Sequence, residues 1–154
     1  MPLYNKIIIK LINNNISVST AESCTGGLLS YTFIKHKGIS KIFKLGLICY
    51  SDNSKIKLLK IKKNLLKKYG AVSNQVAKAM LINLIKITKS DLSIITTGIA
   101  GPSGGSKKKP IGLVYIGIQY NKKLKIFKKK FTGSRIKIQN KAINFIFKEI
   151  DKSI

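Results

Sequence analysis

The sequence predicts a three-layer α/β/α sandwich with a mixed sheet of about five strands. Helical segments alternate with short apolar segments over the first two thirds of the chain, an order typical of parallel strands joined by right-handed crossovers. Near the end, two strand-like segments flank Asn121-Lys122-Lys123, which adds an antiparallel hairpin. With 154 residues, the chain can bury one substantial core, and we expect a single domain over residues 1–154.

The first 60 residues contain five predicted elements. Apolar residues recur at helical spacing near the N-terminus, and shorter apolar runs bounded by polar residues follow. The elements are a helix over residues 3–12, a strand over 16–20, a helix over 28–35, a buried strand over 43–50 and a helix from about 52 to 60. We expect the strand over 43–50 to be buried because its apolar run is nearly continuous. Ser51 and Asp52 are N-cap candidates for the helix that follows.

The remaining residues predict two helices and three strands. A helix that starts at Ser73 carries an apolar stripe from Val76 to Ile85. It is followed by a strand over 92–97, the hairpin strands 111–120 and 124–131, and a helix over about 135–150. The order of these elements makes the predicted sheet mixed, because the hairpin strands run antiparallel to each other.

Three predicted loops follow the strand ends, over residues 21–27, 51–55 and 98–109. In open α/β sheets, ligands bind outside the carboxyl ends of the strands. These loops also contain much of the chain's glycine and polar side chains. We therefore expect the functional site to lie where the three loops meet.

The net charge of +25 arises from 30 basic and 5 acidic residues. Ile occurs 27 times and Asn 11 times, whereas Arg135 is the only arginine. This bias is typical of proteins encoded by AT-rich genomes. A protein selected to contact nucleic acid normally keeps arginines for bidentate contacts with phosphates and base edges. We interpret the charge mainly as genome composition and expect no more than non-specific contact with nucleic acid.

The cellular setting is inferred from the cysteines and the apolar segments. Cys24 and Cys49 are too few for a disulfide framework. Lys6 and Lys10 interrupt the apolar run at the N-terminus, so it does not resemble a signal peptide. No segment approaches the ~20 uncharged apolar residues that span a bilayer. These features predict a cytoplasmic protein that does not insert into membranes.

The inventory of reactive side chains restricts the possible chemistry. The single histidine, His36, lies between two lysines and is interpreted as a surface residue, which argues against a Ser-His-Asp triad. The cysteines and the five scattered acids show no metal-ligand spacing. A hydroxyl or thiol nucleophile activated by lysine or tyrosine remains, and we expect neither a metal nor a cofactor.

Two segments are candidates for this chemistry. The segment from Ser23 to Gly27 is predicted to join a strand to a helix, which would place a hydroxyl beside backbone N–H groups and the positive end of the helix. A structural cap is the alternative use of such residues. The glycine-rich segment from Gly98 to Gly105 matches neither a Walker loop nor a dinucleotide fingerprint, so it could be a plain turn or a ligand cradle.

Four separated motifs give the chain a family resemblance. They are Thr20-Ala-Glu-Ser-Cys-Thr-Gly-Gly27, Tyr50-Ser-Asp-Asn-Ser-Lys55, Gly70-Ala-Val-Ser73 and Thr97-Gly-Ile-Ala-Gly-Pro-Ser-Gly-Gly105. Together they resemble the C-terminal domain family of the competence/damage-inducible protein CinA, over essentially the whole chain and in order. Standalone members of that family are nicotinamide-nucleotide amidohydrolases, also called NMN deamidases (PncC). The resemblance therefore implies a CinA C-terminal-like fold.

The resemblance also implies an activity and three catalytic residues. The reaction is the metal-independent hydrolysis of nicotinamide mononucleotide (NMN) to nicotinate mononucleotide and ammonia, a step of pyridine nucleotide salvage. Ser23 is implied as the nucleophile, Lys55 as its base and Tyr50 as a phenol that assists proton transfer. To act as a base, Lys55 needs a lowered pKa, which we expect from burial, neighbouring positive charge and its place in the first turn of a helix.

Further residues are expected to bind the substrate. Backbone N–H groups of Cys24, Thr25, Gly26 and Gly27 are candidate donors to the oxyanion and the phosphate, and Gly101, Gly104 and Gly105 could wall the pocket. Arg135 is a candidate phosphate contact by resemblance. The family usually has Gly-Asp-Arg there and a second arginine four residues later, whereas this chain has Gly133-Ser134-Arg135 and Gln139.

Alternatives remain at the level of sequence. Cys24 is a rival nucleophile, because a helix N-terminus lowers the pKa of a thiol. The chain could instead be a basic nucleic-acid-associated protein of DNA uptake or repair, or an inactive relative of the family. By resemblance we also expect a homodimer.

Overall fold

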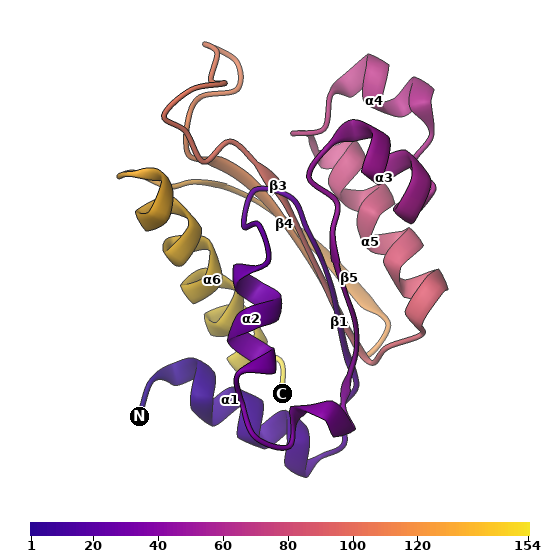
Figure 1. Cartoon of the computed structure of the whole chain (residues 1–154), viewed down its shortest axis with the longest axis vertical. Helices are drawn as coiled ribbons and strands as arrows, with labels where there is room; N and C mark the ends of the chain where they lie inside the picture. The colour runs from indigo at the N-terminus through magenta and orange to yellow at the C-terminus, as the bar shows by residue number, and fades with distance from the viewer.

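The computed structural model describes residues 1–154 and contains one five-stranded sheet between two helical layers (Figure 1). The strand order is β2-β1-β3-β4-β5. The interior strand β1 (Val18–Glu22) is parallel to its neighbours β2 (Phe43–Ile48) and β3 (Leu92–Gly98). The strand β4 (Leu113–Tyr120) is antiparallel to both of its neighbours, β3 and β5 (Lys123–Lys130). The predicted three-layer fold with a mixed sheet is confirmed.

Helices cover both faces of the sheet (Figure 1). One layer consists of α1 (Leu3–Asn13), α2 (Leu28–Ile34) and α6 (Arg135–Asp151), and the other of α3 (Asp52–Leu59), α4 (Lys63–Tyr69) and α5 (Asn74–Thr88). A short 3-10 helix, η1 (Ile39–Lys41), leads from α2 into β2. Each layer encloses its own core, with 21 buried apolar residues beneath the first and 13 beneath the second. The three inner strands, β1, β3 and β4, are therefore buried on both faces.

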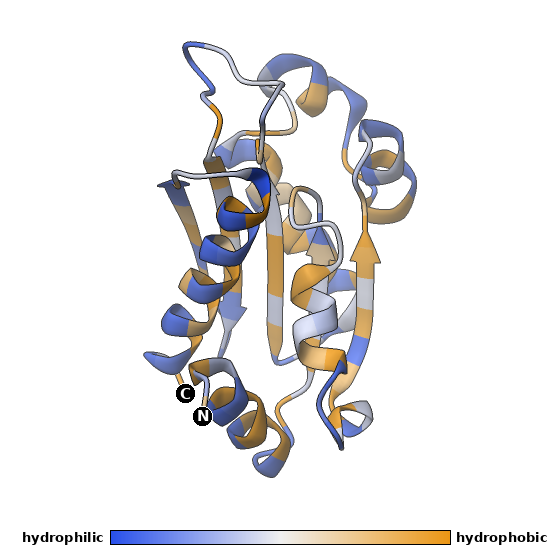
Figure 2. Ribbon diagram, turned by 60° about the vertical axis from the view of Figure 1, so that its left-hand side comes forward, coloured by the Kyte–Doolittle hydropathy of each residue, from blue (hydrophilic) through white to orange (hydrophobic).

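The helix periodicity produces these cores. Along α5 the buried residues lie on one stripe, from Val76 and Ala77 through Met80 to Leu84. The Ser73 hydroxyl caps this helix by accepting a hydrogen bond from the N–H of Val76, at 3.2 Å. Figure 2 shows that hydrophobic and hydrophilic residues also alternate along α1 and α6, the helices next to the two marked termini. The predicted start of α5 and its apolar stripe are confirmed.

The expectation that residues 43–50 form a fully buried strand is wrong. The strand β2 lies at an edge of the sheet, and alternate residues along it are exposed. Ile48, for example, is 55% exposed, whereas Cys49 just beyond the strand is fully buried. A continuous apolar run does not distinguish a central strand from an edge strand with one open face.

Two further details differ from the sequence-based expectations. The helix α4 was not predicted, because its residues combine lysines with only a few apolar positions. The hairpin turn consists of Asn121 and Lys122 alone, both with positive φ, and Lys123 already pairs with Tyr120. A two-residue turn of this kind matches the twist of the flanking strands.

The fold brings the predicted loops to one edge of the sheet. Because β1, β2 and β3 are parallel, the segments that follow them all leave at their carboxyl ends. Ser23 directly follows β1, and its N–H donates to the carbonyl of Thr96 in β3, at 3.0 Å.

None of the helices is both long and apolar enough to cross a lipid bilayer.

Candidate active site

The centre of the site is a hydrogen bond between a buried lysine and a serine. Lys55 Nζ lies 3.1 Å from Ser23 Oγ. Ser23 is held at the end of β1, and Lys55 is in the first turn of α3, whose start is capped by the Ser51 hydroxyl. The structure thus brings together two residues that lie 32 positions apart in the sequence.

Lys55 is the most deeply buried lysine of the chain. It is only 1% exposed, whereas every other lysine is exposed or half-buried. Burial lowers the pKa of the Lys55 ammonium below its ordinary value, because a charged group loses its hydration there. The expected contribution of neighbouring positive charge is wrong, since the nearby ionisable groups, Cys49 and Asp52 first among them, raise this pKa.

Lys55 Nζ lies within hydrogen-bond distance of three oxygens, so an ammonium donates to all three, whereas a neutral amine donates to two and accepts from the third. Besides Ser23 Oγ, Nζ contacts the carbonyl oxygens of Cys49, at 2.9 Å, and Tyr50, at 3.0 Å. A neutral amine has two N–H bonds and one lone pair. If the two carbonyls accept the two N–H bonds, the lone pair faces the Ser23 hydroxyl. This arrangement allows Lys55 to receive the proton of Ser23.

The segment after Ser23 is fixed by a buried carboxylate. Glu22 accepts hydrogen bonds from the N–H groups of Leu29 and Ser30, at 2.7 and 3.0 Å, and from the hydroxyls of Thr25 and Ser30, both at 2.7 Å. The first free N–H groups of α2 are therefore occupied by the chain's own carboxylate. The N–H groups of Leu29 and Ser30 are therefore not available to a substrate.

Cys24 does not have the properties of a nucleophile. It is 4% exposed, and burial raises the pKa of its thiol to about 12. The expectation that a helix N-terminus lowers this pKa is wrong because loss of hydration dominates. The Cys24 carbonyl accepts a hydrogen bond from the Gln139 side-chain amide in α6, at 2.9 Å.

A small cavity adjoins the Ser23 loop. Its volume is about 180 Å³. It is lined by Cys24, Tyr50, Gly98, Ile99, Ala100, Gly101, Ser103, Gly104 and Arg135. The structure therefore places five of the predicted site residues around one space: Cys24, Tyr50, Gly101, Gly104 and Arg135.

Arg135, at the start of α6, forms hydrogen bonds with two other segments around this cavity. Its Nη1 donates to the carbonyl of Gly101, at 2.7 Å, and its Nη2 to the phenol oxygen of Tyr50, at 3.1 Å. Tyr50 is 59% exposed, and no hydrogen bond joins its phenol to Ser23 or Lys55. The Tyr50 backbone carbonyl, rather than its phenol, contacts the lysine.

The other predicted binding residues support the loop instead of lining the cavity. Thr25 Oγ1 bonds both Glu22 and Thr96, and the Gly26 N–H donates to the Ser23 carbonyl. Gly27 is the N-cap of α2 with φ of 100°, and a Cβ there would lie 2.9 Å from Ile48. Gly105 packs against Ile111, where a Cβ would meet backbone at 2.9 Å.

Three residues of the site were not identified from the sequence: Glu22, Thr96 and Gln139. Each of them holds the Ser23 loop by a hydrogen bond. Thr96 and Gln139 contact the loop from segments more than 70 positions away in the sequence. Glu22 contacts the start of α2, just after the loop, and this contact depends on the turn between them. An acid directly before the candidate nucleophile, at the end of a predicted strand, was the one available signal. Nowhere in the chain do three His, Cys, Asp or Glu side chains gather as metal ligands would.

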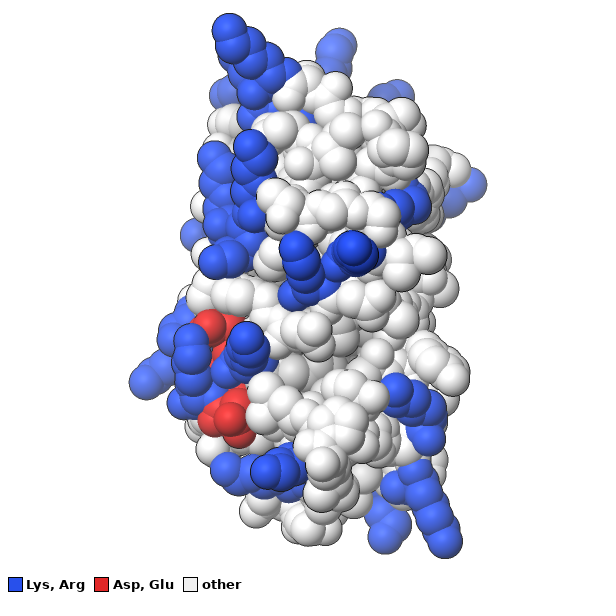
Figure 3. All heavy atoms as spheres, turned by 90° about the vertical axis from the view of Figure 1, so that its left-hand side faces the viewer, with Lys and Arg blue, Asp and Glu red and all other residues white.

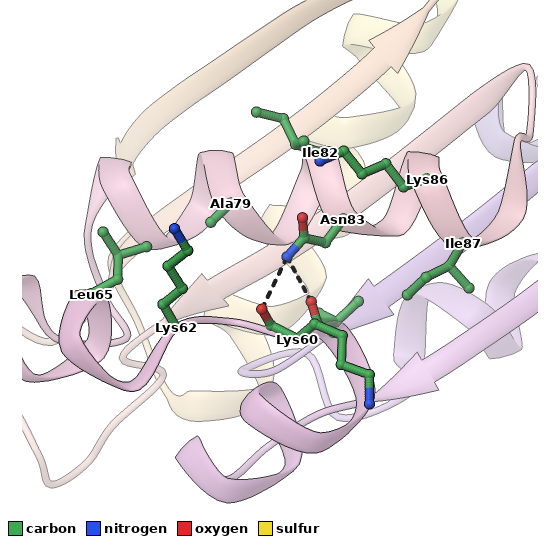
Figure 4. A pocket seen from close by; sticks show the side chains of 9 residues that line it. Lys60, Lys62, Leu65, Ala79, Ile82, Asn83, Lys86 and Ile87 are labelled. Atoms are coloured by element: carbon green, nitrogen blue, oxygen red, sulfur yellow. Dashed lines mark hydrogen bonds between the residues drawn. The ribbon is translucent and has the colours of Figure 1, made fainter.

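A larger hollow of the surface lies elsewhere. A groove of about 560 Å³ runs between α5 and the segment that joins α3 to α4 (Figure 4). Its walls are mainly apolar, and its amide side chain, Asn83, already donates to the carbonyl of Leu59, at 2.7 Å. The groove contains no group resembling the Ser23–Lys55 pair, so size alone does not identify the site.

Comparisons with known proteins identify the family of the chain. A family model described as the CinA C-terminal domain matches residues 1–154. A CinA-like protein of Fusobacterium nucleatum is 51% identical over 128 residues, which are 83% of this chain and 31% of the relative. A relative from Clostridium novyi, named for competence-damage induction, is 49% identical over 133 residues, 86% of this chain and 32% of that protein. The chain thus spans about one third of the length of these relatives.

Solved structures share the fold. The crystal structure of the competence/damage inducible protein CihA from Agrobacterium tumefaciens superimposes with a TM-score of 0.92 and 29% identity, and covers 97% of this chain and 92% of that one. A CinA superfamily protein from Escherichia coli gives a TM-score of 0.91 at 28% identity, over 99% of this chain and 88% of the other. The chain therefore belongs to the CinA family, and it corresponds to the C-terminal domain of that family.

Proposed function

We propose that this protein is a metal-independent amidohydrolase that converts NMN to nicotinate mononucleotide and ammonia. The observation that carries the proposal is the 3.1 Å contact between Ser23 Oγ and Lys55 Nζ, in a setting that lowers the pKa of the lysine. A hydroxyl becomes a competent nucleophile when an adjacent base can take its proton. The substrate is inferred from the resemblance of the motifs to the NMN deamidases.

In the first half of the proposed reaction, Ser23 Oγ attacks the carbon of the carboxamide while its proton passes to Lys55 Nζ. The tetrahedral intermediate carries a negative oxygen. The Gly26 N–H is already used within the loop, so stabilisation of that oxygen falls to the N–H groups of Cys24 and Thr25. Lys55 then returns the proton to the leaving nitrogen, and ammonia departs as the C–N bond breaks.

In the second half, water hydrolyses the ester that links the nicotinoyl group to Ser23. Lys55 accepts a proton from the attacking water and returns it to Ser23 Oγ as the ester bond breaks, which regenerates the starting state. The carbonyls of Cys49 and Tyr50 keep Nζ in place throughout. Catalysis thus needs one base that alternates between its neutral and charged forms.

The nucleotide is oriented by the far side of the cavity. The volume of about 180 Å³ suits the pyridine ring and its carboxamide better than the whole nucleotide, so the phosphate is assigned to the outer rim. Arg135 is the cation at that rim, next to the exposed phenol of Tyr50, and we assign both to the ribose phosphate side. On the face in Figure 3, lysines extend over the whole height of the molecule, and their field attracts an anionic substrate.

The proposal is tested by incubating the purified chain with NMN and measuring nicotinate mononucleotide and ammonia. We expect equimolar release of both products, in the presence of EDTA as in its absence. Salt-sensitive binding of DNA without turnover of NMN would instead favour a nucleic-acid function, since binding through phosphates weakens steeply with salt. Absence of both activities would identify an inactive relative.

A further inference from the structure

The glycine-rich loop between β3 and β4 forms most of the wall of the small cavity beside the Ser23 loop. Six of the nine residues that line this cavity belong to the segment from Gly98 to Gly104. The loop extends beyond the carboxyl ends of the parallel strands (Figure 1), and its residues 102–108 are exposed. The contacts that hold this loop therefore determine the shape of the cavity.

The loop is closed at its base, between Ile99 and Gly112. The Gly112 N–H donates to the Ile99 carbonyl, at 2.7 Å. Beyond the base, one hydrogen bond joins the loop to α6, from Arg135 to the carbonyl of Gly101, at 2.7 Å. Arg135 therefore holds the loop near its start and from one helical layer only.

Lys109 joins the second half of the loop to α4. Its Nζ donates to the carbonyl of Tyr69, the last residue of that helix. The last carbonyls of a helix have no partner within the helix and carry partial negative charge, so a lysine ammonium is favoured beside them. Lys109 is half-buried, whereas Lys107 and Lys108 are exposed. Because Lys109 does not line the cavity, we assign its ammonium to the loop and not to the substrate.

The residues that follow α4 accommodate this lysine. Gly70 has a φ of 76°, and a Cβ there would lie 2.8 Å from Lys109 Nζ, so a side chain at this position would displace the ammonium. The carbonyl of Ala71 accepts a hydrogen bond from Thr97 Oγ1, at 2.8 Å, just before the loop begins. The motif from Gly70 to Ser73, to which the proposed reaction gives no part, thus supports the loop in two ways.

We propose that Lys109 is a positioning residue for the reaction at Ser23: its ammonium fastens the glycine-rich loop to the end of α4 and thereby fixes the cavity wall that binds the substrate. Arg135 and Lys109 hold the loop from different helical layers, since α6 and α4 cover opposite faces of the sheet (Figure 1). Loss of Lys109 leaves the loop beyond its base joined to α6 alone. The substrate in this proposal rests on the proposed function, whereas the fastening of the loop does not.

The first test is the steady-state kinetics of NMN deamidation by Lys109→Met, which removes the ammonium and keeps an unbranched side chain. We expect KM to rise by about tenfold and kcat to change by less than about twofold, because a loosened wall weakens the binding of substrate and transition state alike. Lys108→Met removes the same charge from the exposed neighbour and should leave both constants unchanged. Lys109→Arg keeps a cationic donor and should keep KM within about threefold of the wild-type value.

The second test needs no substrate. Backbone relaxation of the isotope-labelled protein, measured by NMR, reports the mobility of the loop. We expect the order parameters of Gly104 and Ser106 to be lower in Lys109→Met than in the wild type and in Lys108→Met, and to approach the values below about 0.6 of flexible backbone. If the wild type does not hydrolyse NMN, the proposed function fails, and these order parameters still decide whether Lys109 holds the loop.

Four results would overturn the proposal. A KM of Lys109→Met equal to that of the wild type would show that the cavity wall does not need this contact. An equal rise of KM in Lys108→Met would identify the general loss of positive charge as the cause. A fall in kcat with unchanged KM would assign Lys109 to the chemical step. Order parameters of Lys109→Met equal to those of the wild type would show that the lysine does not hold the loop, whatever the substrate.

Discussion

At the carboxyl end of β1, every buried polar side chain around Ser23 has a partner, whereas at the amino end of β3 two buried polar atoms have none. Glu22 accepts four hydrogen bonds and Lys55 Nζ has three polar contacts. Ser90 Oγ and Gln119 Oε1 have no contact of this kind. The buried polar atoms around Ser23 are therefore all paired, whereas two of those at the opposite end of the sheet are not.

The difference bears on function. Around Ser23, the surrounding contacts fix the reacting atoms before a substrate arrives, as catalysis by positioned groups requires. Around Gln119, two buried atoms have neither a hydrogen-bond partner nor appreciable exposed surface. The first arrangement suits a chemical step, whereas the second carries only a desolvation penalty. Four substitutions test this distinction, beginning with the largest expected effect.

Loss of the Ser23 hydroxyl should have the largest effect. We expect Ser23→Ala to reduce NMN deamidation by about 10³-fold or more, because the attacking oxygen is removed. Ser90→Ala removes an equally buried hydroxyl at the other end of the sheet and should retain the wild-type rate. Release of ammonia measures both variants. A Ser23→Ala variant with wild-type activity would refute the assigned nucleophile, and loss of activity in Ser90→Ala would remove the contrast between the two ends.

Replacement of the buried lysine by arginine should be almost as severe. We expect Lys55→Arg to lower the rate by roughly 10²- to 10⁴-fold, the usual contribution of a general base, because a guanidinium stays protonated. Lys60→Arg, on the exposed end of α3, makes the same change and should have no effect. The variants are compared by initial rates at a single pH. A fully active Lys55→Arg would show that positive charge, not proton transfer, is what this position provides.

Disruption of the Glu22 contacts should mainly affect stability. In Glu22→Gln an amide N–H₂ would face the N–H groups of α2, so we expect a loss of about 3 kcal/mol in the free energy of unfolding. Glu149→Gln breaks a pair with the exposed Lys152 and should cost about 1 kcal/mol or less. Urea unfolding compares the two variants. Equal losses would mean that the buried carboxylate contributes no more than a surface pair.

Removal of the unpaired amide should have the smallest effect, with the opposite sign. We expect Gln119→Leu to leave the stability unchanged or raise it by about 1 kcal/mol, because an unpaired buried acceptor is replaced by an apolar side chain. Urea unfolding measures the change. A loss as large as that expected for Glu22→Gln would show that Gln119 is satisfied by contacts of its own.

The sequence predicted the fold class and five strands in their order along the chain, because helical and strand periodicities are strong and the loops carry recognisable turn residues. It did not predict the order of the strands within the sheet. The burial predicted for β2 was wrong, because an apolar run does not show that one face of the strand is exposed. The helix α4 was not predicted, because its few apolar residues are interspersed with lysines. The strand predicted over 16–20 lies two residues later, at Val18–Glu22. Boundaries depend on tertiary pairing, which a single sequence does not show.

For the site, the motifs and the family resemblance predicted Ser23, Lys55 and the cavity residues Gly101, Gly104 and Arg135, but not the residues that hold them in place. The pKa of Cys24 was expected to fall because a helix end was considered without the burial that outweighs it. The occupation of the α2 end by Glu22, and the contact of Gln139 with the Cys24 carbonyl, depend on three-dimensional proximity. The unpaired atoms of Ser90 and Gln119 likewise have no signature in the sequence.

The pH dependence of NMN deamidation tests the central claim most directly. Burial lowers the pKa of Lys55, so the neutral form that accepts the proton of Ser23 should grow with pH and reach its plateau below the ordinary lysine pKa of about 10.4. We therefore expect kcat/KM to rise with pH through the lowered pKa of Lys55 and then to level off before the pH reaches about 10.4. A value of kcat/KM that does not change with pH below about 10.4, or that still rises at pH values above it, would contradict the assignment of Lys55 as the buried base.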